Sequence, residues 1–195
     1  MKNDSHNPKH PLATVVSPAN LVTLARLLFS PILFAVTVNA SESYGASWWG
    51  FGLGWLLASS DVIDGQLARR RGTVSRWGAF LDPLADKVVV IGMAICLVRV
   101  ERYHWVPVFL LVLREVLITI YRLKMARQGF AIPARRSAKW KTVVQGLALM
   151  LAVLPPLQNA GYLISSALWV AIAFTLFTGV QYFLDGARAA SISGG

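Results

Sequence analysis

Four aspartates fall within one short stretch of the sequence and could together bind a metal ion. Asp61 and Asp64 are three residues apart, and Asp82 and Asp86 are four residues apart. In a helix, either spacing places both carboxylates on one face. Four neighbouring carboxylates repel one another unless cations neutralise them, and oxygen ligands with no His or Cys nearby favour Mg²⁺ or Mn²⁺ over zinc. The sequence therefore predicts a site for hard divalent cations.

Small residues and one arginine accompany these aspartates at helical intervals. Gly65, Ala68 and Gly78 each lie within about one turn of an aspartate, where a small side chain leaves room for a ligand against the helix backbone. Arg69 lies two turns after the first aspartate, and an arginine beside bound cations suits a diphosphate group. The alternative is that the small residues serve only close helix packing, as they often do in membranes.

The elements that must position these residues are indicated by the composition. Of 195 residues, 55% are hydrophobic and 14% are charged, against roughly 25% charged in an average soluble domain. This composition excludes a disordered chain and argues against an ordinary soluble enzyme. It indicates a membrane protein with several spanning helices. The single cysteine, Cys96, excludes an intrachain disulfide.

Six apolar segments approach the length that a helix needs to span a bilayer. They are Leu21–Asn39, Trp48–Ile63, Phe80–Val98, Trp105–Tyr121, Val143–Leu154 and Tyr162–Leu184. We therefore expect an all-α integral membrane protein with six transmembrane helices. Residues 1–17 would form a cytoplasmic N-terminal head, residues 18–188 one six-helix domain, and residues 189–195 a C-terminal tail.

Details of these helices depend on single residues. The second segment is short unless its helix continues past Ser60, and Pro155-Pro156 is expected to separate the last two helices with a turn. Pro83 is compatible with the third helix if Asp82 lies in the first turn. Arg26, inside the first apolar segment, favours a retained helix over a cleaved signal peptide.

Positive charge is concentrated in alternate connections between the segments. The stretches Arg69–Arg76 and Arg122–Lys141 hold eleven of the 19 basic residues. Because cytoplasmic loops are enriched in Lys and Arg, we predict that these stretches and both termini face the cytoplasm, in the cytoplasmic (inner) membrane. The net charge of +10 then reflects orientation and phosphate binding, with no nucleic acid as a partner. The outer interface would carry an aromatic belt of Trp48, Trp49, Tyr103 and Trp105.

The aspartates, small residues and arginine together match the signature of a known family. Residues 61–69, Asp-Val-Ile-Asp-Gly-Gln-Leu-Ala-Arg, and residues 78–86, Gly-Ala-Phe-Leu-Asp-Pro-Leu-Ala-Asp, fit D-x-x-D-G-x-x-A-R-x8-G-x-x-x-D-x-x-x-D at every specified position. The chain therefore resembles the CDP-alcohol phosphotransferase family from about residue 18 to residue 188. The resemblance implies a six-helix membrane enzyme, usually homodimeric, that moves the phosphatidyl group of CDP-diacylglycerol onto an alcohol and releases CMP.

The resemblance also implies roles for individual residues. It makes Asp61, Asp64, Asp82 and Asp86 the ligands of two divalent cations, Mg²⁺ or Mn²⁺. It also makes Asp86 the general base, a choice between Asp82 and Asp86 that spacing alone leaves open. A base is needed because the pKa of an alcohol lies far above neutrality. The residues that the resemblance places near the CDP moiety are Asn20, Thr23, Gly65, Ala68, Arg69, Ser75 and Gly78.

The acceptor alcohol is predicted from the basic residues and from one version of the motif. A phosphorylated acceptor needs a cationic pocket, for which the candidates are Arg114, Arg122, Lys139 and Lys141. Residues 82–87, Asp-Pro-Leu-Ala-Asp-Lys, resemble the branch of the family that makes phosphatidylglycerophosphate, so we expect glycerol 3-phosphate as the acceptor. Two points stay open. Glu115 could pair with Arg114 in a purely structural role, and Lys87 could be an active-site cation or could extend its amine to the membrane interface.

Three alternatives use similar residues. The same reaction could have inositol phosphate or phosphatidylglycerol as its acceptor. A membrane prenyltransferase would carry its two Asp-rich motifs in separate helical repeats, whereas both pairs here share one helix hairpin. A metal transporter could also use four acids, but it would not need the small residues and the arginine at these intervals. Only the first alternative would release CMP.

Overall fold

The computed structural model describes the backbone of residues 18–71, 76–127 and 136–193 and the side chains of residues 23–59, 84–125 and 140–185. Within these ranges the chain forms six α-helices, two short 3₁₀ helices and no strand. They are α2 (Pro18–Asn39), η1 (Ser41–Ser43), α3 (Trp48–Arg71), α4 (Arg76–Arg99), α5 (Trp105–Arg127), α6 (Arg136–Val153), η2 (Pro155–Leu157) and α7 (Gly161–Ser193). The all-α prediction is confirmed, and each predicted segment corresponds to one helix.

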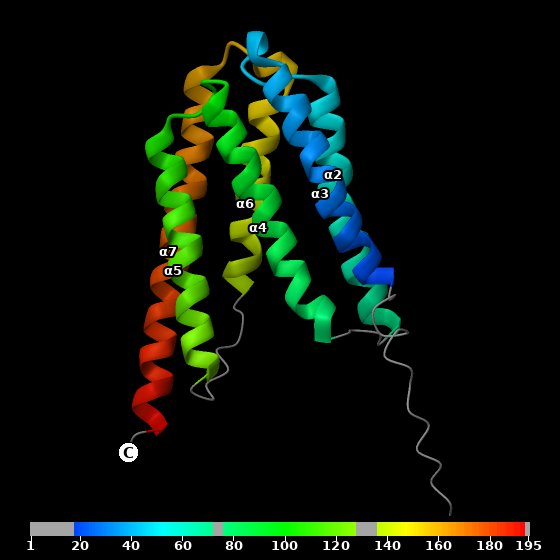
Figure 1. The fold of residues 1–195 in the computed structure, drawn as a ribbon. Helices are drawn as coiled ribbons and strands as arrows, with labels where there is room; N and C mark the ends of the chain where they lie inside the picture. Colours follow the sequence, from blue (N-terminus) through cyan, green and yellow to red (C-terminus); the bar gives the residue numbers. More distant parts are fainter. Residues whose placement is uncertain (1–17, 72–75, 128–135, 194–195) are drawn as a thin grey trace, which may run out of the picture.

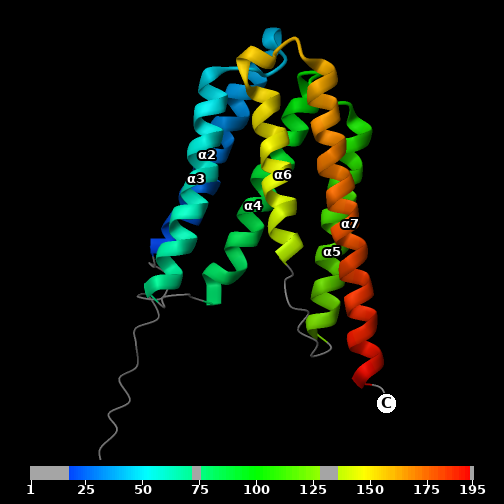
Figure 2. The same cartoon turned by 180° about the vertical axis from the view of Figure 1, so that it is seen from behind.

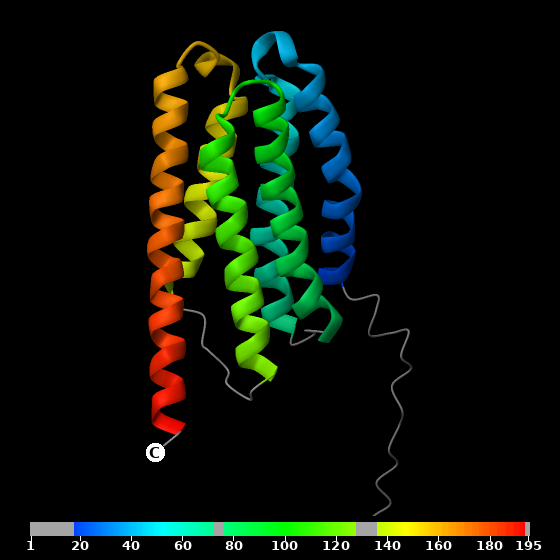
Figure 3. The same ribbon diagram turned by 60° about the vertical axis from the view of Figure 1, so that its left-hand side comes forward.

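Successive helices run in alternate directions, so the bundle has two distinct ends (Figure 1). One end carries η1, the α4–α5 connection and η2. The start of α2, the facing ends of α3 and α4, those of α5 and α6, and the end of α7 lie at the other end. Seen from behind, α6 lies between α3 and α7 (Figure 2). Helix α7 also runs alongside α5 (Figure 3). The residues that the sequence analysis assigned to the site therefore lie toward the end of the bundle where α2 begins and α7 ends.

Two predictions about helix limits have different outcomes. Helix α3 continues past Ser60 to Arg71, as its length required, and η2 separates α6 from α7 at Pro155. The expectation that Asp82 lies in the first turn of its helix is wrong, because α4 begins at Arg76 and Asp82 lies beyond that turn. The third helix therefore starts earlier than its apolar residues indicate.

A proline inside α2 is accommodated by a neighbouring hydroxyl group. Pro31 has no backbone N–H to donate to the carbonyl of Leu27, one turn earlier. The hydroxyl of Ser30, which is buried, donates to that carbonyl at 3.0 Å instead. Such replacement by Ser or Thr is how helices in apolar surroundings tolerate proline.

Close contact between α2 and α4 depends on a glycine. A Cβ atom added at Gly92 would lie 2.3 Å from the ring of Phe34, so any larger residue would force that ring to move. The interior around this contact is apolar and includes Leu33, Met93 and Leu97. The packing of α2 against α4 thereby fixes the helix that carries Asp86.

An arginine holds together the end of the bundle that carries η1 and η2. Arg102, between α4 and α5, donates from Nε to the carbonyl of Ala152 at 3.0 Å, from Nη1 to Gln158 at 2.6 Å and from Nη2 to Leu157 at 2.7 Å. These carbonyls belong to the end of α6 and to the turn after it, where helices leave acceptors unsatisfied. The side chain therefore caps the end of α6 and fixes the turn toward α7.

The aromatic belt is only partly as expected. Trp48, Trp49 and Trp105 are exposed at the end of the bundle that carries η1 and η2. Tyr103 is 3% exposed, and its hydroxyl donates to the carbonyl of Ala148 at 2.8 Å. Burial raises the pKa of the Tyr103 phenol, which keeps the group neutral as a donor. The prediction that Tyr103 faces the interface is therefore wrong, because its hydroxyl has a buried partner.

The outer surface of the bundle is strongly apolar. Large hydrophobic side chains with about half or more of their surface exposed occur on every helix whose side chains are described, among them Leu28, Trp55, Ile95, Ile120, Leu147 and Val170. By length and apolarity, Gly161–Asp185 in α7 is the one helix of the described part that could cross a membrane, and Thr23–Asn39 and Trp140–Val153 are shorter apolar stretches. Helix α5 carries its charged pair Arg114 and Glu115 buried.

Candidate active site

Residues from four helices line one cavity of about 170 Å³. Its walls come from α4, α5, α6 and α7. The lining side chains are Asp86, Lys87, Val90, Ile91, Arg114, Glu115, Ile118, Arg122, Lys141, Thr142, Gln145 and Tyr182. The cavity thus brings together the predicted general base and three of the four residues predicted to bind the acceptor phosphate.

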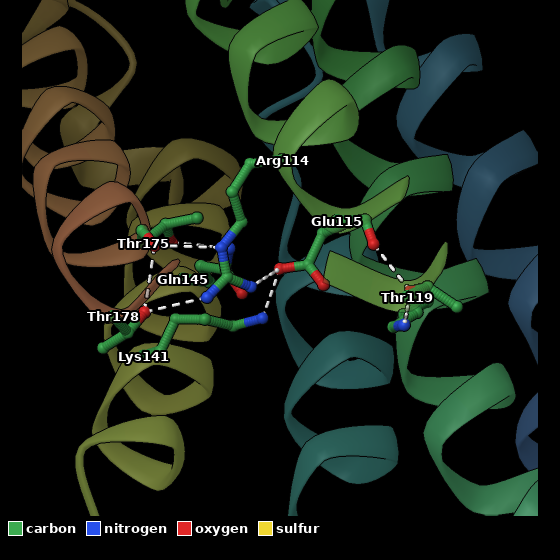
Figure 4. A network of polar contacts seen from close by, with 8 residues as sticks. Arg114, Glu115, Thr119, Lys141, Gln145, Thr175 and Thr178 are labelled. Atoms are coloured by element: carbon green, nitrogen blue, oxygen red, sulfur yellow. Dashed lines mark hydrogen bonds and ion pairs between the residues drawn. The ribbon is translucent and has the colours of Figure 1, made fainter. Parts of the chain in front are cut away.

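Arg114, on the wall of this cavity, is bound to three different groups (Figure 4). Its Nε donates to the carbonyl of Thr175 at 2.9 Å, its Nη2 to the hydroxyl of Thr178 at 2.9 Å, and its Nη1 to Glu115 Oε1 at 2.9 Å. Gly179 leaves room for this side chain, since an added Cβ atom would lie 3.3 Å from Nε, a tight contact. Glu115 pairs with Arg114, as considered from the sequence, and the arginine connects α5 to α7; whether the pair also serves the acceptor stays a prediction.

Glu115 also forms an ion pair with Lys141 of α6 through the same carboxylate oxygen. The side chains of Glu115, Arg114 and Lys141 are 6%, 9% and 13% exposed. Two cations therefore share one buried carboxylate in surroundings that hold little water. Such an arrangement fixes the positions of the cations, because moving one of them away would leave a buried charge without its partner.

Lys87 and Arg122 provide the remaining positive charges of the cavity. The Lys87 ammonium group, half-buried, donates to the hydroxyl of Thr119 on α5. The guanidinium of Arg122 lies over the ring of Tyr182, 5.8 Å from its centroid, a cation–π contact between α5 and α7. The Arg122 side chain is exposed, so it forms the part of the cavity that is open to solvent.

Asp86 is the one member of the aspartate set whose side chain the structure describes; it is half-buried on α4. Asp61 and Asp64 lie within the continuous helix α3, and Asp82 lies with Asp86 within α4. The helical spacing on which the metal prediction depends is therefore present in the backbone. Among the described side chains, no group of three or more His, Cys, Asp or Glu residues could hold a metal ion, and three of the four predicted ligands lie outside them.

The residues predicted to contact the CDP moiety lie on the same helices. Thr23 lies near the start of α2 and is 2% exposed. The backbone of Asn20 belongs to α2, that of Gly65, Ala68 and Arg69 to α3, and that of Gly78 to α4; their surroundings lie outside the described side chains, as does the side chain of Lys139, whose backbone belongs to α6. Ser75 lies outside the described residues. The roles of all these residues stay predictions.

Several polar residues that line the cavity or bond to its wall were not predicted. Gln145 Nε2 donates to Thr175 Oγ1 at 2.9 Å, and Thr178 Oγ1 donates to the Thr175 carbonyl at 2.9 Å. A usable signal was present in the sequence, because Thr175 and Thr178 lie three residues apart in an apolar helix, and polar residues inside apolar helices are functional candidates. A second cavity, of about 670 Å³, lies at the opposite end around Tyr103 and Trp105 and contains none of the predicted site residues.

Residues 16–189 match the model of the CDP-alcohol phosphatidyltransferase family. The chain belongs to this family and is therefore a transferase of phospholipid biosynthesis.

Named relatives within this family are similar to the chain over most of its length. The chain is 35% identical over 180 residues to a Mycobacterium tuberculosis protein named "Probable phosphatidylglycerophosphate synthase". This match covers 90% of this chain and 84% of the relative. It is 32% identical to proteins of Rickettsia typhi and Bacillus subtilis that are both named "CDP-diacylglycerol--glycerol-3-phosphate 3-phosphatidyltransferase", each match covering 84% of this chain and 93% or 92% of the relative.

A solved structure has a similar fold. It is the crystal structure of Mycobacterium tuberculosis phosphatidylinositol phosphate synthase with CDP-DAG bound, which aligns with a TM-score of 0.61 and 17% sequence identity over 90% of this chain and 89% of the other. At this identity the likeness concerns the fold of the bundle.

Proposed function

We propose that this enzyme transfers the phosphatidyl group of CDP-diacylglycerol to glycerol 3-phosphate, forming phosphatidylglycerophosphate and releasing CMP. The observation that carries the proposal is the shared cavity, in which Asp86 lies with Arg122 and Lys141. A base and phosphate-binding cations in one cavity would let a single acceptor bind through its phosphate and give up its hydroxyl proton. The names of the relatives from Rickettsia typhi and Bacillus subtilis support the same acceptor.

The charge of the cavity supports a phosphorylated acceptor. Its charged lining side chains are four cations, Lys87, Arg114, Arg122 and Lys141, and two carboxylates, Asp86 and Glu115. The positive excess matches a phosphate monoester, which carries about two negative charges near neutral pH. Phosphatidylglycerol would bring an uncharged glycerol end to this cavity and would leave the excess unbalanced, which is costly in a partly buried site. The charge balance therefore favours glycerol 3-phosphate over phosphatidylglycerol.

Two divalent cations, Mg²⁺ or Mn²⁺, belong to the proposed mechanism. Asp61, Asp64, Asp82 and Asp86 would hold them, since the donor set consists of carboxylate oxygens and each pair lies in one continuous helix. Bound there, the cations would neutralise the diphosphate and the charge that develops on the departing CMP.

The protein side chains would act on the acceptor. Arg122 and Lys141 would orient the phosphate of glycerol 3-phosphate, and Asp86 would accept the proton of the attacking hydroxyl group. Arg114, whose Nε, Nη1 and Nη2 all bond to protein groups, would mainly hold Glu115 and the cavity wall in place.

The proposal includes a membrane arrangement. Six helices would span the cytoplasmic membrane with both termini and the active site facing the cytoplasm, and the enzyme would work as a homodimer. The lipid would keep its acyl chains in the bilayer while its headgroup meets the aspartates. The exposed apolar side chains around the bundle support this arrangement, because a soluble surface rarely carries apolar patches of this extent.

The test is an assay of the purified protein in detergent with Mg²⁺ or Mn²⁺, CDP-diacylglycerol and labelled acceptors. CMP release and labelled phosphatidylglycerophosphate with glycerol 3-phosphate are expected. Turnover with inositol phosphate or phosphatidylglycerol, but none with glycerol 3-phosphate, would refute the acceptor assignment. A metal transporter would release no CMP with any acceptor.

A further inference from the structure

Lys87 lies next to Asp86 in the sequence and reaches the same cavity. Its position is inside α4, well away from both helix ends. A lysine that extends its amine to the membrane interface lies near a helix end, whereas the Lys87 ammonium group turns inward and donates to Thr119 on α5. Its place in the bundle is therefore that of a cation inside the cavity.

Thr119 is arranged to accept this hydrogen bond. Its hydroxyl group donates its own proton to the backbone carbonyl of Glu115 at 2.6 Å, so the oxygen faces Lys87 with its lone pairs. A lysine ammonium group has three N–H donors, and one of them is used by Thr119. The other two remain for a ligand, because the described residues supply no further hydrogen bond to this group.

Arg114 is the cation of the cavity that the protein engages most fully, and the Arg122 guanidinium lies over the Tyr182 ring. Arg114 donates from three nitrogen atoms to Thr175, Thr178 and Glu115, and Lys141 is paired with Glu115. Lys87 is the cation that follows Asp86 directly in α4, lines the same cavity and uses one of its three donors within the described residues. A phosphate bound there would place the rest of a small acceptor within reach of that carboxylate.

We propose that Lys87, positioned by Thr119, binds the acceptor phosphate next to Asp86 and makes the enzyme prefer phosphorylated acceptors to glycerol. The inference rests on the proposed function, since it assigns a residue to the acceptor of that reaction. Lys87 is the binding residue, and Thr119 is a positioning residue that acts through it.

The variants Lys87→Met and Thr119→Val test the two roles. Methionine keeps the length and apolar stem of lysine without the charge, and valine keeps the shape of threonine without the hydroxyl group. We expect Lys87→Met to raise the KM for glycerol 3-phosphate about 10-fold to 100-fold, the effect of losing a charged hydrogen bond, with the KM for CDP-diacylglycerol within about twofold of wild type. Its preference for glycerol 3-phosphate over glycerol should fall by the same factor.

Thr119→Val should raise the KM for glycerol 3-phosphate about 3-fold to 10-fold, and Thr119→Ser, which retains the hydroxyl group, should restore most of the loss. An unchanged KM for glycerol 3-phosphate in Lys87→Met would overturn the proposal. An equal rise in the KM for CDP-diacylglycerol would also overturn it, because the residue would then act on both substrates. If Thr119→Val kept the wild-type KM for glycerol 3-phosphate, the positioning role of Thr119 would be excluded.

A binding measurement separates this inference from the proposed function. Inorganic phosphate should raise the unfolding temperature of the wild-type protein in detergent and should have little effect on Lys87→Met, without any turnover. If the wild-type enzyme released no CMP with glycerol 3-phosphate, the proposed acceptor would be wrong. The unfolding temperatures of wild type and Lys87→Met with phosphate would still measure phosphate binding by Lys87. Equal stabilisation of both proteins by phosphate would contradict the role of Lys87.

Discussion

Replacing Glu115 by glutamine removes the negative charge that Arg114 and Lys141 share. The amide has nearly the same size as the carboxylate, so the packing of α5 is retained. The amide oxygen can still accept a hydrogen bond, but the two buried cations lose the negative charge that they share. The variant therefore isolates the electrostatic part of the contact.

The expected loss of stability is large because all three side chains are shielded from water. With exposures of 6%, 9% and 13%, solvent cannot replace the missing charge. Removing one partner of a buried pair typically costs about 3–5 kcal/mol. In a protein of this length each kcal/mol lowers the unfolding temperature by about 2–4 °C. We therefore expect Glu115→Gln to unfold about 6–20 °C below wild type.

Thermal unfolding in detergent, followed by tryptophan fluorescence, measures the effect. Glu101→Gln is the matched control, because Glu101 is an exposed carboxylate at the opposite end of the bundle, and a change at such a site is expected to shift stability by less than about 0.5 kcal/mol. An unfolding temperature of Glu115→Gln within about 2 °C of wild type would refute the reasoning from the buried pair.

Three further predictions address the base, the turn and the helix contact. Asp86→Asn should lower the rate of CMP release at least about 100-fold, as expected for a lost general base, while CDP-diacylglycerol binding is largely retained; a fully active variant would exclude Asp86 as the base. Arg102→Met should lower the free energy of unfolding by roughly 3 kcal/mol or more, because three carbonyls lose a charged donor, and wild-type stability in chemical denaturation would contradict this. Gly92→Ala should destabilise the protein by about 1–3 kcal/mol through contact with Phe34. The control Gly52→Ala, with nothing within 4 Å of the added Cβ, should be neutral or stabilising, and equal effects of the two substitutions would argue against a specific helix contact.

The helices were predictable because apolar length and helix breakers act locally. Pro155 ends a continuous apolar stretch wherever the remaining chain packs, and the turn is found there. The continuation of α3 past Ser60 followed from the length that a spanning helix needs. The start of α4 was less predictable, because residues 76–79 carry little apolar periodicity and their helical state depends on the following turns.

The partners of polar residues could not be predicted, because they depend on contacts between distant helices. Tyr103 and Trp105 both suit an interface by residue type, yet the Tyr103 hydroxyl finds the Ala148 carbonyl across the bundle. Arg114 was predicted as a candidate for the cationic pocket, but its bonds to Thr175 and Thr178 of α7 require knowledge of which helix lies opposite. The presence of charged residues in apolar segments indicated the site, and the fold determined which of them share a cavity.

The polar groups of the cavity also hold α5 in the bundle. Arg114 connects α5 to α7, Glu115 connects it to Lys141 of α6, and Thr119 connects it to Lys87 of α4. Each of these bonds ends at a residue that lines the cavity or lies beside it. A phosphate that binds the cations would therefore reinforce the contacts among all four helices, and its binding should stabilise the fold as well as position the acceptor. It follows that substitutions at Glu115 should weaken both stability and acceptor binding, whereas Lys87→Met should weaken acceptor binding more than stability, because Lys87 makes one contact with α5 and Glu115 joins two cations.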